Sequence, residues 1–181
     1  SVFVTKAGVG FSDLSSFTEL RRENYVGTMY KYSDYNSTIK NNPEDFVVYY
    51  PNTEYTATYF NKSDLASNEF EHEEGLFWDI SDSQRSSWYS TFIRGDSYSV
   101  KAVTSCKNGR KLLIVKDSYG NALAPYMLEG FEEIYIVDAR AFEKPLDETI
   151  ERLGITDVLF AECTFSAVGK SYIEHLKELC K

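Results

Sequence analysis

The chain has 181 residues, of which 43% are hydrophobic and 26% are charged, and its formal net charge at pH 7 is −9. This composition is ordinary for a globular protein with a sizeable core, built as one large domain or as a small domain with an elaboration. The charge argues against nucleic-acid binding, because phosphate contacts need clustered Lys and Arg. No apolar run reaches the roughly 18–20 residues that cross a bilayer.

The first residues, Ser1 to Val4, have neither an initiator Met nor the basic and apolar regions of a signal peptide. We therefore expect a processed chain or a fragment. The cysteines Cys106, Cys163 and Cys180 are odd in number and have no CxxC spacing, which excludes a disulfide framework and a thiolate zinc site. Cys163 and Cys180 lie in apolar segments and are expected to be core thiols. We predict no cofactor and no metal site.

Residues 24–106 are rich in Tyr, Ser, Thr, Asn and Asp, and their short alternating apolar runs are typical of β structure. The runs 46–50 and 53–60 flank Pro51-Asn52, which predicts a β-hairpin with a tight turn. Residues 91–103 are predicted to form another extended pair. The many Tyr residues indicate extra half-exposed strands, or alternatively a sugar-binding surface. We interpret this segment as irregular β structure.

Residues 107–181 show a different pattern, in which strands and helices alternate. The continuous apolar runs are at 112–115, 134–137 and 158–160, and amphipathic segments follow at 145–153 and 172–180. Buried strands separated by amphipathic helices indicate a parallel sheet that is covered on both faces and connected by right-handed crossovers. We therefore predict an α/β fold for this part of the chain.

Ligands of parallel α/β sheets bind beyond the carboxyl ends of the strands. The first such end is followed by Asp117-Ser118-Tyr119-Gly120-Asn121. A serine in a tight strand-to-helix turn exposes its hydroxyl, and Asn121 could cap the helix or donate its amide to an oxyanion. The same residues are also ordinary helix-capping chemistry, so both interpretations stay open. We expect the helix to start around Asn121, with Pro125 in its first turn.

A second serine matches a motif literally. Gly95-Asp96-Ser97 spells the Gly-Asp-Ser motif of GDSL esterases, and Arg94-Gly95-Asp96 is an integrin-type tripeptide. A nucleophile turn needs a buried strand before it and a helix after it. Here an amphipathic segment precedes the motif and a predicted strand, 99–103, follows it. Neither interpretation of this motif is favoured.

A nucleophilic serine needs a base, and the chain has two histidines. His72 lies in an acidic run and is predicted to be a surface residue. His175 lies where SGNH hydrolases carry Asp-x-x-His, but Tyr172 occupies the Asp position, and helical phasing predicts exposure to solvent. Neither imidazole is expected within hydrogen-bond reach of the Ser118 hydroxyl.

Four stretches together resemble a known family. Residues 111–122, 133–142 and 154–159 resemble the C-terminal region of DHHW-family bacterial surface proteins, and residues 25–30 resemble a segment that the family carries downstream of its naming motif. The resemblance covers most of residues 24–165 in order. Such proteins are similar in plan to the alginate O-acetylation proteins, whose SGNH-like domains place an Asp-x-His pair before the serine.

The resemblance implies half of an SGNH/flavodoxin-like three-layer α/β domain preceded by the irregular β-rich segment. By the same resemblance Ser118 matches the catalytic serine, and Asp117 and Asn121 are the other candidate catalytic residues. The Asp-His-His-Trp motif is absent from the 181 residues. This departure implies a missing upstream half, with residues 1–23 as the lead-in from it.

We predict a fragment of a cell-surface SGNH-like esterase or O-acetyltransferase-related protein that is inactive by itself. Its expected location is extracellular or at a bacterial cell surface. Its expected partners are a cell-surface glycan and the missing N-terminal half, and no nucleic acid. The alternative is a non-catalytic carbohydrate-binding or scaffold module, which exposed Trp78 and Trp88 rings would favour because sugars stack on such rings.

Overall fold

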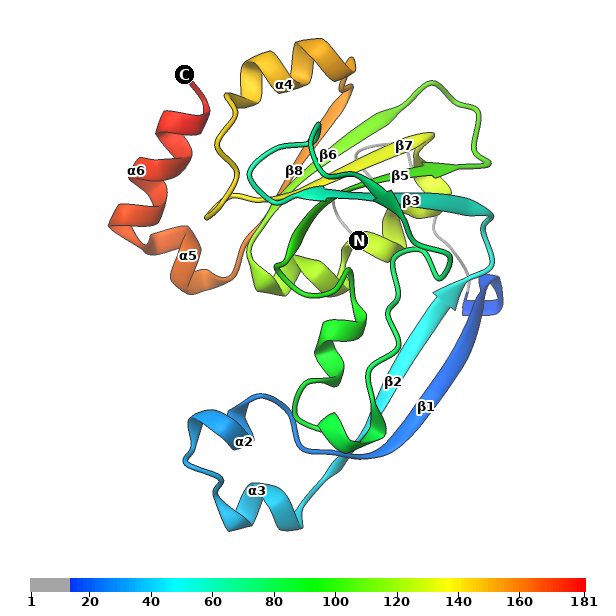
Figure 1. The fold of residues 1–181 in the computed structure, drawn as a ribbon, viewed down its shortest axis with the longest axis vertical. Helices are drawn as coiled ribbons and strands as arrows, with labels where there is room; N and C mark the ends of the chain where they lie inside the picture. The colour runs from blue at the N-terminus through cyan, green and yellow to red at the C-terminus, as the bar shows by residue number, and fades with distance from the viewer. Residues whose placement is uncertain (1–13) are drawn as a thin grey trace.

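The computed structural model describes residues 14–181, which form a two-stranded ribbon and a six-stranded sheet with helices around it (Figure 1). The strands are β1 (Phe17–Tyr25), β2 (Glu44–Pro51), β3 (Tyr55–Asn61), β4 (Phe70–Glu71), β5 (Tyr98–Thr104), β6 (Lys111–Lys116), β7 (Glu133–Asp138) and β8 (Asp157–Ala161). The α-helices are α2 (Met29–Tyr32), α3 (Ser37–Asn41), α4 (Leu146–Leu153), α5 (Thr164–Val168) and α6 (Lys170–Leu179). The 3₁₀ helices are η1 (Leu14–Ser16), η2 (Asp82–Gln84), η3 (Trp88–Thr91), η4 (Ser118–Ala122) and η5 (Ala124–Gly130).

The predicted parallel arrangement of the last third of the chain is confirmed. β6 pairs in parallel with β7 on one side and with β8 on the other, so that Ile114 lies opposite Ile136 and Leu159. α4 follows Pro145 and ends at Gly154, whose φ of 66° is a left-handed conformation that glycine adopts without strain. The α/β fold class predicted from the sequence is therefore correct.

The Tyr-rich segment does not form a separate irregular layer, since three of its strands, β3, β4 and β5, extend the same sheet. The strand order is β4-β3-β5-β7-β6-β8. β5 pairs antiparallel with β7, with Val100 opposite Ile136, and β3 pairs antiparallel with β5, with Ala57 opposite Ala102. The sheet is consequently mixed, and its middle strands come from both halves of the sequence.

The hairpin predicted for residues 46–50 and 53–60 is wrong, because β2 pairs with β1 and β3 pairs with β4 and β5. The Asn52 N–H donates to the Ser16 carbonyl at 2.9 Å instead of closing a turn between β2 and β3. Of the extended pair predicted at 91–103, only β5 is a strand. Local alternation predicts that a strand forms, but its partner is chosen by packing of distant segments.

Both faces of the large sheet are covered. One face packs against α4 and α6, and the other packs against η5 and an aromatic segment, residues 76–93. Residues of β6 and β7 alternate between the two sides: Leu113, Val115, Tyr135 and Val137 face the first, and Leu112, Ile114, Ile134 and Ile136 face the second. The ribbon of β1 and β2 runs away from the sheet and carries α2 and α3 at its far end (Figure 1).

Several aromatic side chains are packed inside the protein. The buried Tyr59 hydroxyl donates to the Gly75 carbonyl at 2.8 Å and accepts from Trp78 Nε1 at 2.9 Å. The His72 ring stacks on Trp78 at 3.8 Å, and its Nε2 lies 3.2 Å from the Phe77 carbonyl. His72 is therefore half-buried, and the expectation of a surface residue is wrong because this aromatic cluster provides a stacking partner.

The cysteines differ from expectation as well. Cys180 is exposed and Cys163 is half-buried, so neither is a core thiol. The last turn of α6 places Leu179, not Cys180, against the sheet. In residues 14–181 no helix combines the length and the apolar character that crossing a membrane requires.

The mixed sheet leads to a prediction about the isolated α/β segment. Residues 107–181 expressed alone would lose the β5 partner of β7 and expose the inner face that Ile134 and Ile136 share with the first half. We expect this fragment to show no cooperative thermal or urea unfolding transition, whereas the 181-residue chain shows one. A cooperative transition of the fragment, followed by circular dichroism, would mean that residues 107–181 are an independent domain.

Candidate functional site

Ser118 lies at the carboxyl edge of the parallel strands, two residues after β6. Its side chain is half-exposed. The 3₁₀ helix η4 begins at Ser118, three residues before the expected start, and Asp117 caps it by accepting the Tyr119 N–H at 2.9 Å. Pro125 lies in the first turn of η5, where its missing N–H leaves no bond unmade.

Asp117 fixes the turn to the loop after β8. Its Oδ2 accepts the Cys163 N–H at 2.9 Å and the Ser166 hydroxyl at 2.7 Å. Burial would raise the pKa of Asp117, but these hydrogen bonds and the Tyr119 N–H outweigh it and lower that pKa. The contacts of Asp117 are those of a capping residue that holds the strand-to-helix turn in place.

Gly120 lets this turn pack closely on the end of β6. A Cβ at this position would lie 2.5 Å from Lys116 Cβ and 3.1 Å from the Ala161 carbonyl. Both contacts are closer than a side chain tolerates, so any other residue would displace either the buried Lys116 stem or the end of β8. The glycine therefore keeps the Ser118 turn tight against the sheet.

The Ser118 hydroxyl is held by a carboxylate that is distant in sequence. Ser118 Oγ donates to Asp96 Oδ2 at 2.9 Å, and Asn121 Nδ2 donates to Asp96 Oδ1 at 3.0 Å. Asn121 is buried and its amide faces Asp96. Asp96 precedes β5, and pairing of β5 with β7 carries it to the carboxyl ends of the parallel strands.

Asp96 also belongs to a cluster of charged side chains next to the serine. Lys116, whose side chain is 0% exposed, lies 3.0 Å from Asp96 and 3.3 Å from Asp138. Arg140 Nη2 lies 2.7 Å from Asp96 Oδ2 and also pairs with Asp138. Two cations and two carboxylates therefore connect the ends of β6 and β7 to the start of β5.

This cluster keeps Asp96 ionised. Burial would raise the pKa of Asp96, but the Lys116 charge and the hydrogen bonds from Asn121, Arg140 and Lys116 hold it well below its usual range. A carboxylate of such low basicity is a poor proton acceptor. Asp96 can orient the Ser118 hydroxyl, but it cannot readily take its proton.

Sequence reasoning placed Ser118 correctly at the strand end, and it missed the charged residues Asp96, Lys116, Asp138 and Arg140. Gly95-Asp96-Ser97 is followed directly by β5, so Ser97 does not lie in a nucleophile turn. The motif nevertheless supplies Asp96 to the site. Asp138 and Arg140 follow the next parallel strand, and the rule that pointed to Ser118 could have identified them as well.

Neither histidine is joined to the Ser118 hydroxyl by a hydrogen bond. His72 belongs to the aromatic cluster around Trp78, and His175 is exposed on α6. The side-chain hydrogen-bond partner of the Ser118 hydroxyl is Asp96. Within the described part of the chain no group of three His, Cys, Asp or Glu side chains is arranged to hold a metal ion.

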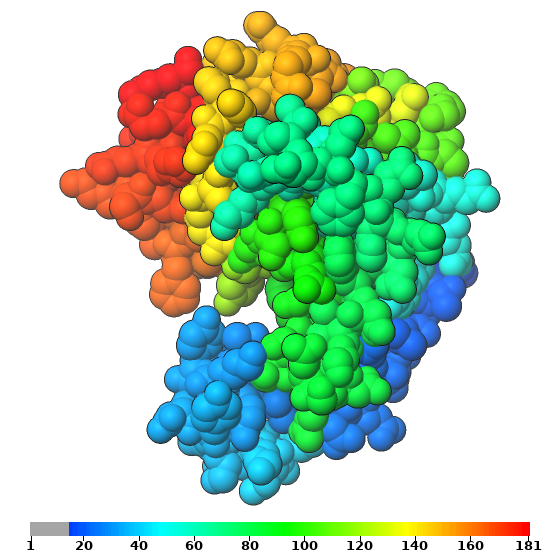
Figure 2. Space-filling view, viewed as in Figure 1, coloured from blue at the N-terminus to red at the C-terminus, as the bar shows by residue number. Residues whose placement is uncertain are grey.

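A groove of about 860 Å³ leads to the serine. It separates the α2–α3 lobe from the body of the protein, where Figure 2 shows a hollow between the blue lobe and the atoms above it. Its lining from the lobe includes Tyr25, Val26, Gly27, Thr28, Met29, Tyr32 and Ile39, and its lining from the body is Tyr89, Ser118 and Tyr119. Segments that are far apart in the sequence thus form one surface around Ser118.

Four tyrosines, Tyr25, Tyr32, Tyr89 and Tyr119, contribute to the walls of this groove. Tyr32 and Tyr119 are 80% and 72% exposed, so their faces are open to a ligand. The Tyr89 hydroxyl donates to the Ser118 carbonyl at 2.9 Å, and burial raises its pKa to about 12. Tyr89 therefore stays protonated at neutral pH and anchors the serine turn to the wall of the groove.

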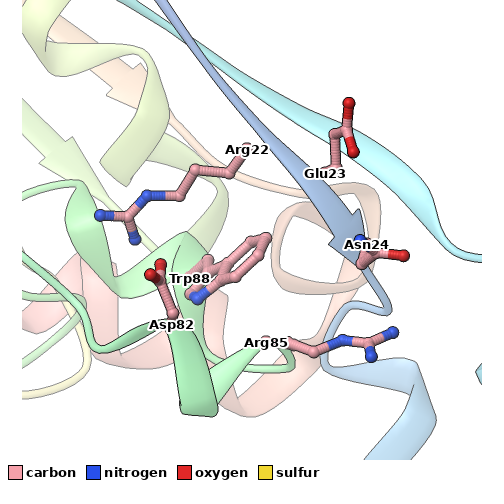
Figure 3. A pocket seen from close by; sticks show the side chains of 6 residues that line it. All are labelled: Arg22, Glu23, Asn24, Asp82, Arg85 and Trp88. Carbon is pink, nitrogen blue, oxygen red and sulfur yellow. The ribbon is translucent and has the colours of Figure 1, made fainter.

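A second pocket, of about 640 Å³, is lined by Trp88, by the end of β1 and by Asp82 and Arg85. Figure 3 shows Arg22 and Arg85 on opposite sides of the ring with their guanidinium groups pointing apart. Arg22 is already bound to the Ile80 carbonyl at 2.7 Å and to Asp79 at 3.0 Å. The two cations do not converge, so this pocket is not built to hold an anion.

The tryptophans do not form the sugar platforms that the alternative hypothesis needs. Trp88 is 3% exposed. The rings of His72 and Tyr98 both stack with the Trp78 ring, and the Arg94 guanidinium lies 5.0 Å from the centre of that ring. Open aromatic faces occur at the tyrosines of the groove instead.

The chain matches a family model described as DHHW protein over residues 1–137. The crystal structure of a DHHW family protein from Eubacterium siraeum DSM 15702 is 45% identical, with a TM-score of 0.87, and the match covers 97% of this chain and 57% of that one. Two structures of Bacillus cereus PatB1, one with a sulfonyl adduct, are 17% identical with TM-scores of 0.70; each match covers 94% of this chain, and 56% and 58% of those chains. No curated protein matches.

The buried cation gives a stability prediction. Lys116→Met keeps the length of the side chain but removes the buried one of the two cations that Asp96 and Asp138 share, so that only Arg140 remains. We expect a loss of about 3–5 kcal/mol in the free energy of unfolding. Lys111→Met on the same strand is the control. Glu133 would keep its contact with Lys101, so the control should cost no more than about 1 kcal/mol. If urea unfolding gives equal losses of unfolding free energy for Lys116→Met and Lys111→Met, the cluster has no special structural role.

The depressed pKa of Asp96 gives a pH prediction. The folded pKa lies below the unfolded value of about 3.9, so Asp96 stabilises the fold above that pH and loses this contribution as the pH falls toward the folded pKa. Asp96→Asn should therefore flatten the decline of unfolding free energy on the acid side. The control is Asp34→Asn, at an exposed turn, whose unfolding free energy should decline with falling pH as that of the parent does. Matching acid-side slopes for the parent and Asp96→Asn would show that ionisation of Asp96 is not coupled to folding.

Proposed function

The chain belongs to the DHHW family, and from this premise we propose that Ser118 is the nucleophile of an SGNH-like acyl-transfer site, in an esterase or O-acetyltransferase that acts on cell-surface glycans. The observation that carries the proposal is the position of Ser118. It lies at the carboxyl edge of parallel strands, half-exposed, at the end of a groove. Its hydroxyl is bonded to a carboxylate and not only to backbone, as a purely structural cap would be.

The chemistry follows the usual logic of a nucleophilic serine. Ser118 Oγ would attack an ester carbonyl, a base would take the hydroxyl proton, and the acyl group would pass to water or to a sugar hydroxyl. Asp96 orients the hydroxyl before attack, and its strong pairing with Lys116 and Arg140 keeps it in place. Asp117 and Asn121 act as positioning residues that hold the turn and its carboxylate.

We further propose that the base is an imidazole from a part of the full-length protein outside these 181 residues. Two observations support this. Neither His72 nor His175 is bonded to Ser118, and the chain spans 57% of the length of the Eubacterium siraeum relative. The 181-residue chain by itself would then bind and orient a substrate without an efficient proton acceptor.

The groove supports a carbohydrate ester as the substrate class. Exposed rings of Tyr32 and Tyr119 offer flat apolar faces, and their hydroxyls remain in water, which suits a sugar with one apolar face and a polar rim. Thr38, Asn42 and Glu44 add hydrogen-bonding groups to the same lining. A glycan of this kind agrees with a location outside the cell, which we infer from the family resemblance.

A non-catalytic carbohydrate-binding module is the second candidate, and the same groove favours it. It would use the tyrosine faces without any chemistry at Ser118. The two functions differ in one measurable respect, because only the first requires the serine hydroxyl to react.

We expect the full-length protein to hydrolyse p-nitrophenyl acetate, and Ser118→Ala to lower kcat/KM by at least about a thousandfold because the nucleophile is lost. Labelling by a phenylmethylsulfonyl group, followed by intact mass, should require Ser118; the sulfonyl adduct of PatB1 motivates this probe. The 181-residue chain alone should show almost no turnover.

The matched control is Ser97→Ala, which removes the exposed serine of the Gly-Asp-Ser motif and should leave turnover and labelling unchanged. If Ser118→Ala retains parental turnover, the nucleophile assignment fails. If the full-length protein shows no hydrolysis but binds oligosaccharide in a Tyr32-dependent manner, the binding module is the better description.

A further inference from the structure

We propose that the groove in front of Ser118 takes an uncharged glycan and rejects an acidic one, and that Glu44 is the residue that sets this preference. The groove is the one assigned to the glycan above, so this proposal rests on the proposed function and names its substrate class. It concerns the charge of the sugar units that lie in the groove, and it is tested by binding rather than by turnover.

The described lining of the groove contains a single charged side chain, Glu44. Glu44 is the first residue of β2, is exposed, and forms no ion pair within residues 14–181. No Lys or Arg of the described residues lines the groove. Carboxylate, phosphate and sulfate groups are recognised in proteins through such cations, and an anion that finds none loses its hydration without compensation. The lining therefore disfavours an acidic sugar.

The cations beside the serine are already neutralised. Lys116 and Arg140 both pair with Asp96 and Asp138, so their charges are balanced within the cluster. Asp117, directly before the serine, adds a carboxylate whose contacts are neutral hydrogen-bond donors. The end of the groove at the serine thus carries an excess of negative charge.

The two cations of the α2–α3 lobe do not compensate for this excess. Lys31 Nζ donates to Ser87 Oγ at 2.8 Å, and Lys40 is exposed on α3. Neither side chain belongs to the described lining of the groove. Because exposed charges are screened over about 8 Å at physiological ionic strength, Glu44 dominates the field on this wall.

The charge of Glu44 acts on a residue of the groove wall. Tyr25 lines the groove and lies opposite Glu44 in the β1–β2 ribbon. Burial raises the pKa of the Tyr25 hydroxyl, and the Glu44 carboxylate raises it further. An anionic sugar substituent beside Tyr25 would meet the same field.

The polar groups of this wall suit the donors of an uncharged sugar. Asn42 Nδ2 donates to the Thr38 carbonyl at 2.8 Å, which leaves Asn42 Oδ1 as an acceptor for a ligand. Together with the Glu44 carboxylate it accepts hydrogen bonds from sugar hydroxyl or amide groups. The open rings of Tyr32 and Tyr119 add apolar faces without charge. Acceptors and apolar faces match a neutral glycan and repel carboxylate oxygens.

Binding to matched oligosaccharides tests the preference. The probes are tetragalacturonate and tetramannuronate, each as the free acid and as the methyl ester, so that only the charge differs within a pair. Full-length Ser118→Ala is used because it should not hydrolyse the esters. By calorimetry at physiological ionic strength, the Kd of at least one methyl ester should be at least about tenfold lower than that of its free acid. Equal or tighter binding of the free acids, or binding of none of the four probes, would overturn the proposal.

Substitution of Glu44 tests the residue assignment. In the same background Glu44→Gln should reduce the preference for the methyl ester, and Glu44→Lys should reverse it. The matched control is Glu71→Lys, which makes the same change of net charge at an exposed position of β4 outside the groove lining and should keep the parental preference. Equal shifts for Glu44→Lys and Glu71→Lys would mean that net charge, and not Glu44, sets the preference.

The outcomes separate this proposal from the catalytic one. If p-nitrophenyl acetate turnover depends on Ser118 but the preference for the methyl esters is absent, only the neutral-glycan proposal fails. If the preference is present but turnover does not depend on Ser118, only the nucleophile assignment fails.

Discussion

The buried ammonium of Lys116 is the interaction on which this structure most depends. A cation with no solvent exposure is tolerated only if anions surround it, and Asp96 before β5 and Asp138 at the end of β7 supply them. This requirement fixes the start of β5 and the end of β7 against the end of β6. Because Ser118 follows β6 by two residues, the same requirement sets the position of its hydroxyl and the carboxylate that orients it.

Glycine and aspartate at the turn complete this arrangement. Gly120 allows η4 to lie on the Lys116 stem, and Asp117 fastens the turn to the loop after β8 through Cys163 and Ser166. Each residue around Ser118 thus has a structural contact that also serves the site. The candidate catalytic residues and the residues that stabilise the sheet are largely the same set, so substitutions here will affect folding and activity together.

The sequence by itself determined the elements whose signals are local. Apolar runs and their spacing predicted β6, β7 and β8 as parallel strands, Pro145 and Gly154 bounded α4, and the strand-end rule pointed to Ser118. Only the tertiary structure decided which strands pair across long separations. It placed β5 beside β7, separated β2 from β3, and brought Asp96 to Ser118. The physical reason is that a strand's alternation specifies which face is buried, whereas its partner is selected by side chains and charges on segments that are distant in the chain.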